Sequence, residues 1–202
     1  MARRKIANPL ALAVLACLYE RPMHPYEMAT TMRSRHKDES IKLNYGSLYA
    51  VVDALQRAGL IEAHETCREG RRPERTVYRI TDAGLHELLD WLSELLSSPV
   101  KEYTQFEAGL SFLPVVAPEE AIILLRTRID HLDIELTGRR SVRSHLGERV
   151  PPLFSVEYEY KTALLEAELA WLRRLVDDIA SESLGGIDFW KAIHAGAEGE
   201  AP

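Results

Sequence analysis

The chain lacks the features that mark secreted, membrane and catalytic proteins. Its 202 residues include only two cysteines, Cys17 and Cys67, which give no disulfide framework and indicate a reducing, cytoplasmic compartment. No apolar run approaches the roughly 18 residues that a membrane-spanning helix needs. Neither a glycine-rich phosphate loop nor a G-x-S-x-G motif occurs, so we expect neither an enzyme nor a bound cofactor.

Metal ligands are equally sparse. The nearest approach to a metal pair is His64 and Cys67, whose side chains, three residues apart on an expected strand, face opposite sides and cannot easily share one ion. We therefore expect no metal site. Cys67 also lies in an arginine-rich loop, where a lowered thiol pKa would suit a redox sensor. This alternative role for the cysteine stays open.

The N-terminal stretch MARRKIANPLALAVLACL has a basic start and then an apolar run, as a signal peptide does. The apolar run is interrupted in an amphipathic pattern, however, and no A-x-A cleavage site follows it. We interpret the stretch as a basic arm followed by a first helix of the folded protein.

Charge is distributed unevenly along the chain. The formal net charge is −6, which taken alone argues against a nucleic-acid partner. Residues 1–96, however, hold 14 Lys and Arg against 13 Asp and Glu, whereas residues 97–202 hold 11 against 18. The acidity therefore belongs to the second half, and the first half keeps basic clusters at residues 3–5, 33–37 and 68–79. A local basic rim is sufficient for phosphate contacts on an acidic chain.

Caps, turns and apolar spacing predict a winged helix-turn-helix domain over residues 1–96. Asn44 suits the N-cap of the third helix, Gly59 its left-handed end, and Thr81-Asp82 the start of a fourth helix with all its leucines inside. Gly70 and Pro73 mark the turn of a hairpin with a basic tip. The expected elements are helices 9–20, 25–35, 45–58 and 83–96, with strands 60–65 and 76–80.

The third helix poses a question about its exposed side. Its apolar stripe of Leu48, Val51, Val52 and Leu55 predicts a buried face, so a charged surface is expected opposite. Small and hydrogen-bonding residues stand there instead: Gly46, Tyr49, Ala50, Asp53 and Arg57, with Ser47 beside them. A helix in the major groove of DNA reads base edges by hydrogen bonds and apolar contacts, and small residues let its backbone approach. The pattern indicates a recognition helix.

The second half predicts a helical, coiled-coil-like domain over residues 97–202 that forms a homodimer. Two long helices, from Pro118 to about residue 146 and from Ser155 to Ser181, carry apolar residues in steps of three and four. A second face of the last long helix, at Tyr160, Ala163, Ala167 and Trp171, lacks a partner, which favours a second copy over a four-helix bundle within one chain. The predicted dimer-interface residues are Ile122, Leu125, Ile129, Leu132, Leu136, Leu165, Leu169, Leu172, Val176 and Ile179.

Three motifs in the first half resemble the PadR family of bacterial transcriptional regulators. LAVLACLYERPMHPYEM, NYGSLYAVVDALQRAGLIEA and GRRPERTVYRITDAGLHELLDWL occur in the family's order between Leu10 and Leu96. Pro25 stands where the family usually has glycine, and Ala50 where it often has proline. The helical second half resembles the larger PadR subfamily, related to AphA-like virulence regulators, in which this part serves dimerisation.

The resemblance implies a repressor that binds double-stranded, near-palindromic operator DNA and is released by a small molecule. Phenolic acids and drugs are among the family's ligands. Aromatic residues between the domains could line an effector pocket, although such residues more often only pack: Trp91, Tyr103, Phe106, Phe112, Tyr160 and Trp171. The residues predicted to contact DNA are Tyr26, Lys42, Asn44, Tyr45, Gly46, Ser47 and Tyr49, with Arg71, Arg72 and Arg75 on the wing. The competing hypothesis is a winged-helix module that binds protein with the same face.

Overall fold

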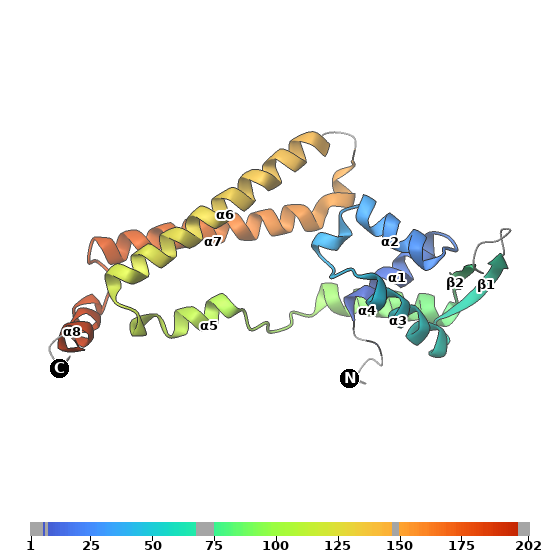
Figure 1. Ribbon diagram of the computed structural model, residues 1–202, viewed down its shortest axis with the longest axis horizontal. Coiled ribbons are helices and arrows are strands. Elements are labelled where there is room, and N and C mark those ends of the chain that lie inside the picture. The colour runs from blue at the N-terminus through green and yellow to red at the C-terminus, as the bar shows by residue number, and fades with distance from the viewer. Residues whose placement is uncertain (1–5, 7, 68–74, 147–149, 198–202) are drawn as a thin grey trace. The chain divides into compact units, whose positions relative to one another are not determined.

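A computed structural model describes residues 6, 8–67, 75–146 and 150–197 (Figure 1). The chain divides into two compact units, Met1–Lys101 and Glu102–Pro202, a few residues beyond the predicted junction. None of the described helices combines the length and the apolar character that a membrane span requires.

The first unit is a winged helix-turn-helix. Helix caps set its boundaries as predicted: Asn8 Oδ1 accepts the Leu10 N–H, and Thr81 Oγ1 accepts the Gly84 N–H. A cap that the sequence reasoning missed is His24, whose Nδ1 accepts the Tyr26 N–H at 3.1 Å. The elements are α1 (Pro9–Glu20), α2 (Pro25–Ser34), the 3-10 turn η1 (Lys37–Glu39), α3 (Tyr45–Arg57), β1 (Ile61–Cys67), β2 (Arg75–Ile80) and α4 (Asp82–Ser97).

The wing is an antiparallel pair of strands, and a β-bridge to Met23 helps to join it to the helices. β1 and β2 pair from Ile61 opposite Ile80 to Cys67 opposite Arg75, with an irregularity between Ala63 and Glu65. Met23, between α1 and α2, bridges Tyr78 of β2, each donating its N–H to the other's carbonyl at 3.0 Å. This bridge ties the base of the wing to the helix-turn-helix.

The core of the first unit is built from α1, α2 and α3, with Ile61 of β1 and the inner side of α4. Fully buried side chains include Leu15, Met28 and Leu48. The prediction that every leucine of α4 points inward is wrong in part, because only one side of a helix can face the core. Leu88 is buried, whereas Leu89, Leu95 and Leu96 are exposed.

The second unit is a helical hairpin with short helices around it. α6 (Pro118–Leu146) and α7 (Val156–Ala180) lie side by side and antiparallel (Figure 1). Their polar edges are joined by the pairs Arg128–Glu168, Arg140–Glu166 and Arg173–Asp133. The remaining elements are α5 (Gln105–Ser111), the 3-10 turns η2 (Leu113–Val115) and η4 (Pro152–Ser155), and α8 (Ile187–Ala197).

The ten residues predicted as a dimer interface lie within this unit's own packing. Seven are buried in a single chain, and Ile122, Ile129 and Leu132 are partly buried against the same cluster. In the single chain they therefore close the hairpin. The seven buried ones are Leu125, Leu136, Leu165, Leu169, Leu172, Val176 and Ile179.

Candidate nucleic-acid interface

The candidate interface is the start of α3, where residues 44–49 present polar groups in a fixed geometry. Asn44 Oδ1 accepts the Ser47 N–H at 2.7 Å, and the Asn44 carbonyl accepts the Leu48 N–H. This cap sets the helix start while the apolar stripe through Leu48 anchors α3 in the core. Lys42, two residues before the cap, is exposed. The first turn of α3 is therefore rigid and open to solvent.

Two tyrosines from different helices stack beside this turn. The rings of Tyr26, in α2, and Tyr45, at the start of α3, lie 6.1 Å apart and within 8° of parallel. Arg33, near the end of α2, donates to the Tyr45 hydroxyl at 2.7 Å, and its guanidinium carbon lies 4.7 Å from the centre of that ring. Tyr26 is 59% exposed and Tyr45 39%. The sequence reasoning selected both tyrosines but missed the role of the arginine that joins them.

Gly46 and Tyr49 lie further along the same face, on α3. A side chain built at Gly46 would meet nothing closer than Asn44 Oδ1, at 3.8 Å, so the fold itself does not demand glycine there. Tyr49 is 45% exposed. Burial, with smaller contributions from Asp53 and Tyr49, raises the pKa of Tyr78 in β2 above its ordinary value. The base of the wing therefore lies near α3, and Tyr78 stays neutral at physiological pH.

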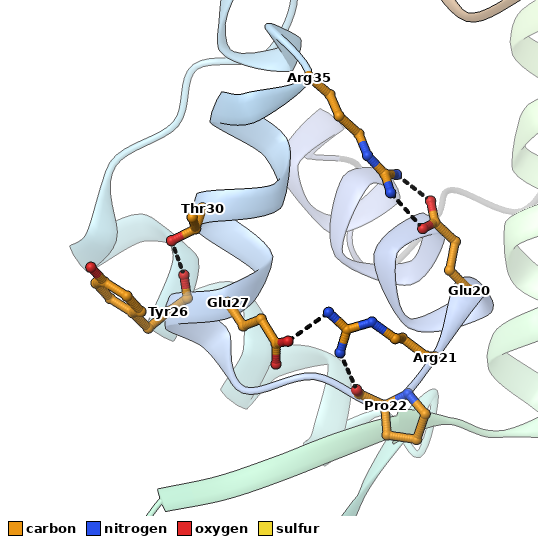
Figure 2. Close-up of polar contacts among 7 residues, drawn as sticks. All are labelled: Glu20, Arg21, Pro22, Tyr26, Glu27, Thr30 and Arg35. Atoms are coloured by element: carbon orange, nitrogen blue, oxygen red, sulfur yellow. Dashed lines mark hydrogen bonds and ion pairs between the residues drawn. The ribbon is translucent and has the colours of Figure 1, made fainter.

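Ion pairs hold α1 and α2 together behind the interface (Figure 2). Both guanidinium nitrogens of Arg35 contact the Glu20 carboxylate, one of them at 2.8 Å, and Arg21 donates to Glu27 at 2.5 Å. The bond to Arg35 lowers the pKa of Glu20, and the bond to Arg21 lowers that of Glu27. Arg35, in a cluster predicted as a basic rim, is thus neutralised by a carboxylate. By contrast, Arg33 has no carboxylate partner among the described residues.

The predicted wing contacts fall largely outside the described residues. Arg71 and Arg72 lie there entirely, and of Arg75 only the backbone at the start of β2 is described. The side chain of Cys67, the candidate redox sensor, is likewise outside them. Arg79, further along β2, pairs with Glu62 across the strands.

Of the six predicted effector residues, Trp91 lies in the first unit and the other five lie in the second. Trp91 is 5% exposed in the core of the first unit, where it packs. In the second unit Phe106 meets Trp171 edge to face at 6.5 Å, and the guanidinium of Arg128 lies 3.7 Å from the Phe106 ring centre. Tyr103, Phe112 and Tyr160 are largely exposed. Among the described residues, no cluster of three or more His, Cys, Asp or Glu is arranged to hold a metal ion.

Solved structures of similar fold include proteins from two Bacillus species. Bacillus subtilis PadR in complex with operator DNA has a TM-score of 0.68 and 20% identity, covering 85% of this chain and 99% of that one. The same protein in complex with p-coumaric acid gives 0.69 and 17%, over 85% and 98%. The PadR-like regulator BC1756 from Bacillus cereus gives 0.59 and 14%, over 86% and 99%. At these identities the likeness establishes the fold.

A protein-family model matches part of this chain. No curated protein matches this chain. Residues 14–90 match the model of the transcriptional regulator PadR-like family, a stretch that runs from α1 to α4 and contains the whole candidate interface. This stretch is therefore a PadR-like domain, similar to the transcriptional regulators of that family.

Proposed function

We propose that the chain is a sequence-specific DNA-binding regulator that acts as a homodimeric repressor and places α3 in the major groove. The observation that carries this proposal is the exposed face of α3 and α2, where Tyr26, Tyr45 and Tyr49 are exposed and Gly46 has open space beside it. Such a face offers hydrogen bonds and close backbone approach with little charge, which is what reading base edges requires. Bacillus subtilis PadR, a relative in fold, has been crystallised with operator DNA.

A homodimer is supported by the outward side of α7. Its exposed apolar residues recur every three or four positions on the side opposite the packed seam. A two-fold dimer covers such a stripe with its own copy and pairs two recognition helices with a near-palindromic operator. The stripe comprises Tyr160, Ala163, Leu164, Ala167 and Trp171.

A small-molecule effector is the less constrained part of the proposal. Bacillus subtilis PadR has been crystallised with p-coumaric acid, an aromatic acid. In this chain the pair Phe106–Trp171 with Arg128 has the aromatic and cationic character that such a ligand matches, although Arg128 already pairs with Glu168 at 2.6 Å. Release of the repressor by an aromatic acid, action in the cytoplasm and the AphA-like subfamily stay predictions.

The test is fluorescence anisotropy of the purified protein on tiled fragments of its own upstream DNA at two salt concentrations. We expect saturable binding to one near-palindromic fragment, competed weakly by random DNA. With roughly eight phosphate contacts per dimer, log affinity should fall with log salt at a slope near −7. Replacing Arg71 and Arg72 together should weaken binding broadly and flatten this slope.

Two outcomes would point elsewhere. Failure to bind any fragment at low salt, with a folded protein, would favour the module that uses this face for a protein partner. Binding that is unchanged when Tyr49 is replaced would mean that a different face meets the DNA, because a base-contacting side chain contributes about 1–3 kcal/mol.

A further inference from the structure

Arg33 occupies a position that the fold does not explain. It is exposed near the end of α2, and no described carboxylate pairs with it, unlike Arg21 and Arg35 of the same region. Its interactions in the described structure are the bond to the Tyr45 hydroxyl at 2.7 Å and the approach to the Tyr45 ring. An unpaired guanidinium held against a tyrosine on the candidate DNA face is available to an anion.

The chemistry of the pair fixes the direction of its hydrogen bonds. A guanidinium only donates, so the Tyr45 oxygen accepts and its own O–H points elsewhere. No described residue accepts that O–H. The remaining N–H groups of Arg33 are unused by any described acceptor as well. Two donors and one positive charge therefore lie side by side, a combination that fits a phosphate oxygen.

The stack with Tyr26 restricts where this pair can point. Tyr45 has two neighbours: the Tyr26 ring, 6.1 Å away and nearly parallel, and the Arg33 guanidinium. A tyrosine held by two neighbours loses less side-chain freedom on binding DNA than a free one would. Arg33 thus restricts the Tyr45 side chain and is also available to bind a phosphate.

We propose that Arg33 is a positioning residue for DNA binding: it orients the Tyr45 hydroxyl and, together with it, binds one backbone phosphate per protomer. The proposal rests on the proposed function and adds to it a residue outside the recognition helix. It implies that Arg33 and Tyr45 act as a unit on the same phosphate.

The experiment needs no operator, because phosphate contacts are independent of sequence. The probe is a fluorescein-labelled, mixed-sequence duplex of about 30 base pairs, titrated with the full chain over a range of salt concentrations. The variants are Arg33→Gln, Arg33→Lys, Tyr45→Phe and the double variant Arg33→Gln with Tyr45→Phe. The matched control is Arg126→Gln, which removes the same charge from an exposed position on α6 in the second unit.

We expect Arg33→Gln to weaken binding about thirtyfold and to reduce the magnitude of the salt slope by about 2, since a dimer loses two phosphate contacts. Arg33→Lys should keep the slope but lose affinity, because an ammonium lacks the planar fork that serves two acceptors. Tyr45→Phe should weaken binding with little change of slope, since a hydroxyl releases no counterion. The double variant should bind no more weakly than Arg33→Gln alone.

Other results would overturn the proposal. If Arg33→Gln binds as Arg126→Gln does, or if the fold-changes of the single variants multiply in the double variant, the pair does not act as a unit on one phosphate. Wild-type protein that fails to bind the duplex at low salt would instead contradict the proposed function, and this inference with it.

Discussion

The two units of the chain bury their apolar residues to different extents. In the first unit, α1, α2 and α3 form a continuous core, and three exposed aromatic residues, Tyr26, Tyr45 and Tyr49, lie on α2 and α3. In the second, the seam between α6 and α7 is packed, yet both helices keep exposed apolar side chains such as Ile134 and Leu164 on their outer sides. The outer sides of α6 and α7 are thus the surface that the proposed dimer would cover.

The largest effect is expected from a charge on the outer stripe of α7. Ala167→Glu would place one carboxylate from each protomer in the proposed dimer interface. Like charges there cost several kcal/mol. Sedimentation should show monomers at concentrations where the wild type is dimeric. Asp177→Lys, on another side of α7, is the control and should stay dimeric. A dimer that survives Ala167→Glu would remove α7 from the interface and weaken the contrast between the units.

Gly84 in the first unit and Gly138 in the second differ in the space around them. A Cβ at Gly84 would lie 2.0 Å from the Leu60 carbonyl oxygen, which also accepts the Thr81 N–H at the start of α4. Gly84→Ala should therefore lower the free energy of unfolding by about 3 kcal/mol. At Gly138 of α6 nothing lies within 4 Å of the added carbon, so Gly138→Ala should stabilise by up to about 1 kcal/mol. Urea denaturation measures both, and equal effects would contradict the packing described for Gly84.

A smaller effect is expected from the ion pair between α1 and α2. Because Arg35 lowers the pKa of Glu20, the pair stabilises the fold above the unfolded carboxyl pKa of about 4.3, and this contribution is lost as the pH falls below it. Both side chains are nearly half exposed, so Glu20→Gln should cost less than about 1 kcal/mol at pH 7. The difference from wild type, measured by urea denaturation, should shrink as the pH falls through the lowered pKa of Glu20, below which its carboxyl is as neutral as the amide.

A double variant checks the origin of that effect. If the pair is its source, Glu20→Gln together with Arg35→Gln should destabilise no more than either alone. Independent, additive losses would mean that each side chain acts through other contacts.

The smallest effect on stability at neutral pH is expected from the buried thiol of Cys17, in the first unit. Burial, with a contribution from Glu20, raises the pKa of Cys17 to about 11. In a Cys67→Ser background, Cys17 should therefore react with iodoacetamide at pH 8 only after unfolding. The protonated thiol favours the fold below its unfolded pKa, so stability should decline as the pH rises from about 9 toward 11. Rapid labelling of the native protein, followed by mass spectrometry, would contradict this burial.

The parts of the fold that could be predicted depend on neighbouring residues. Pro9, Asn44 and Thr81 identify helix starts because a cap needs only a side chain and the next few N–H groups. The family stretch from α1 to α4 likewise follows from short motifs in order. Leu89 and Leu96 were misplaced because six leucines on one helix exceed what a single face can bury.

The features that could not be predicted depend on residues far apart in the chain. The Met23–Tyr78 bridge joins single residues that carry no periodic pattern of their own. Arg33 reaches Tyr45 across the turn between α2 and α3, and nothing in the sequence separates it from Arg35, which Glu20 neutralises. Charge clusters counted along the chain therefore overestimate the free charge of the interface.

The residues on the exposed face of α3 suit DNA binding and are not required by the fold. Gly46→Ala tests this most directly. The added methyl group has room in the protein and improves helix propensity. On the fragment found by the anisotropy screen, the account predicts unchanged or higher stability in urea together with an affinity at least about tenfold weaker, because the methyl group obstructs the groove. Wild-type affinity in a stable Gly46→Ala protein would contradict the account and remove this face from the DNA.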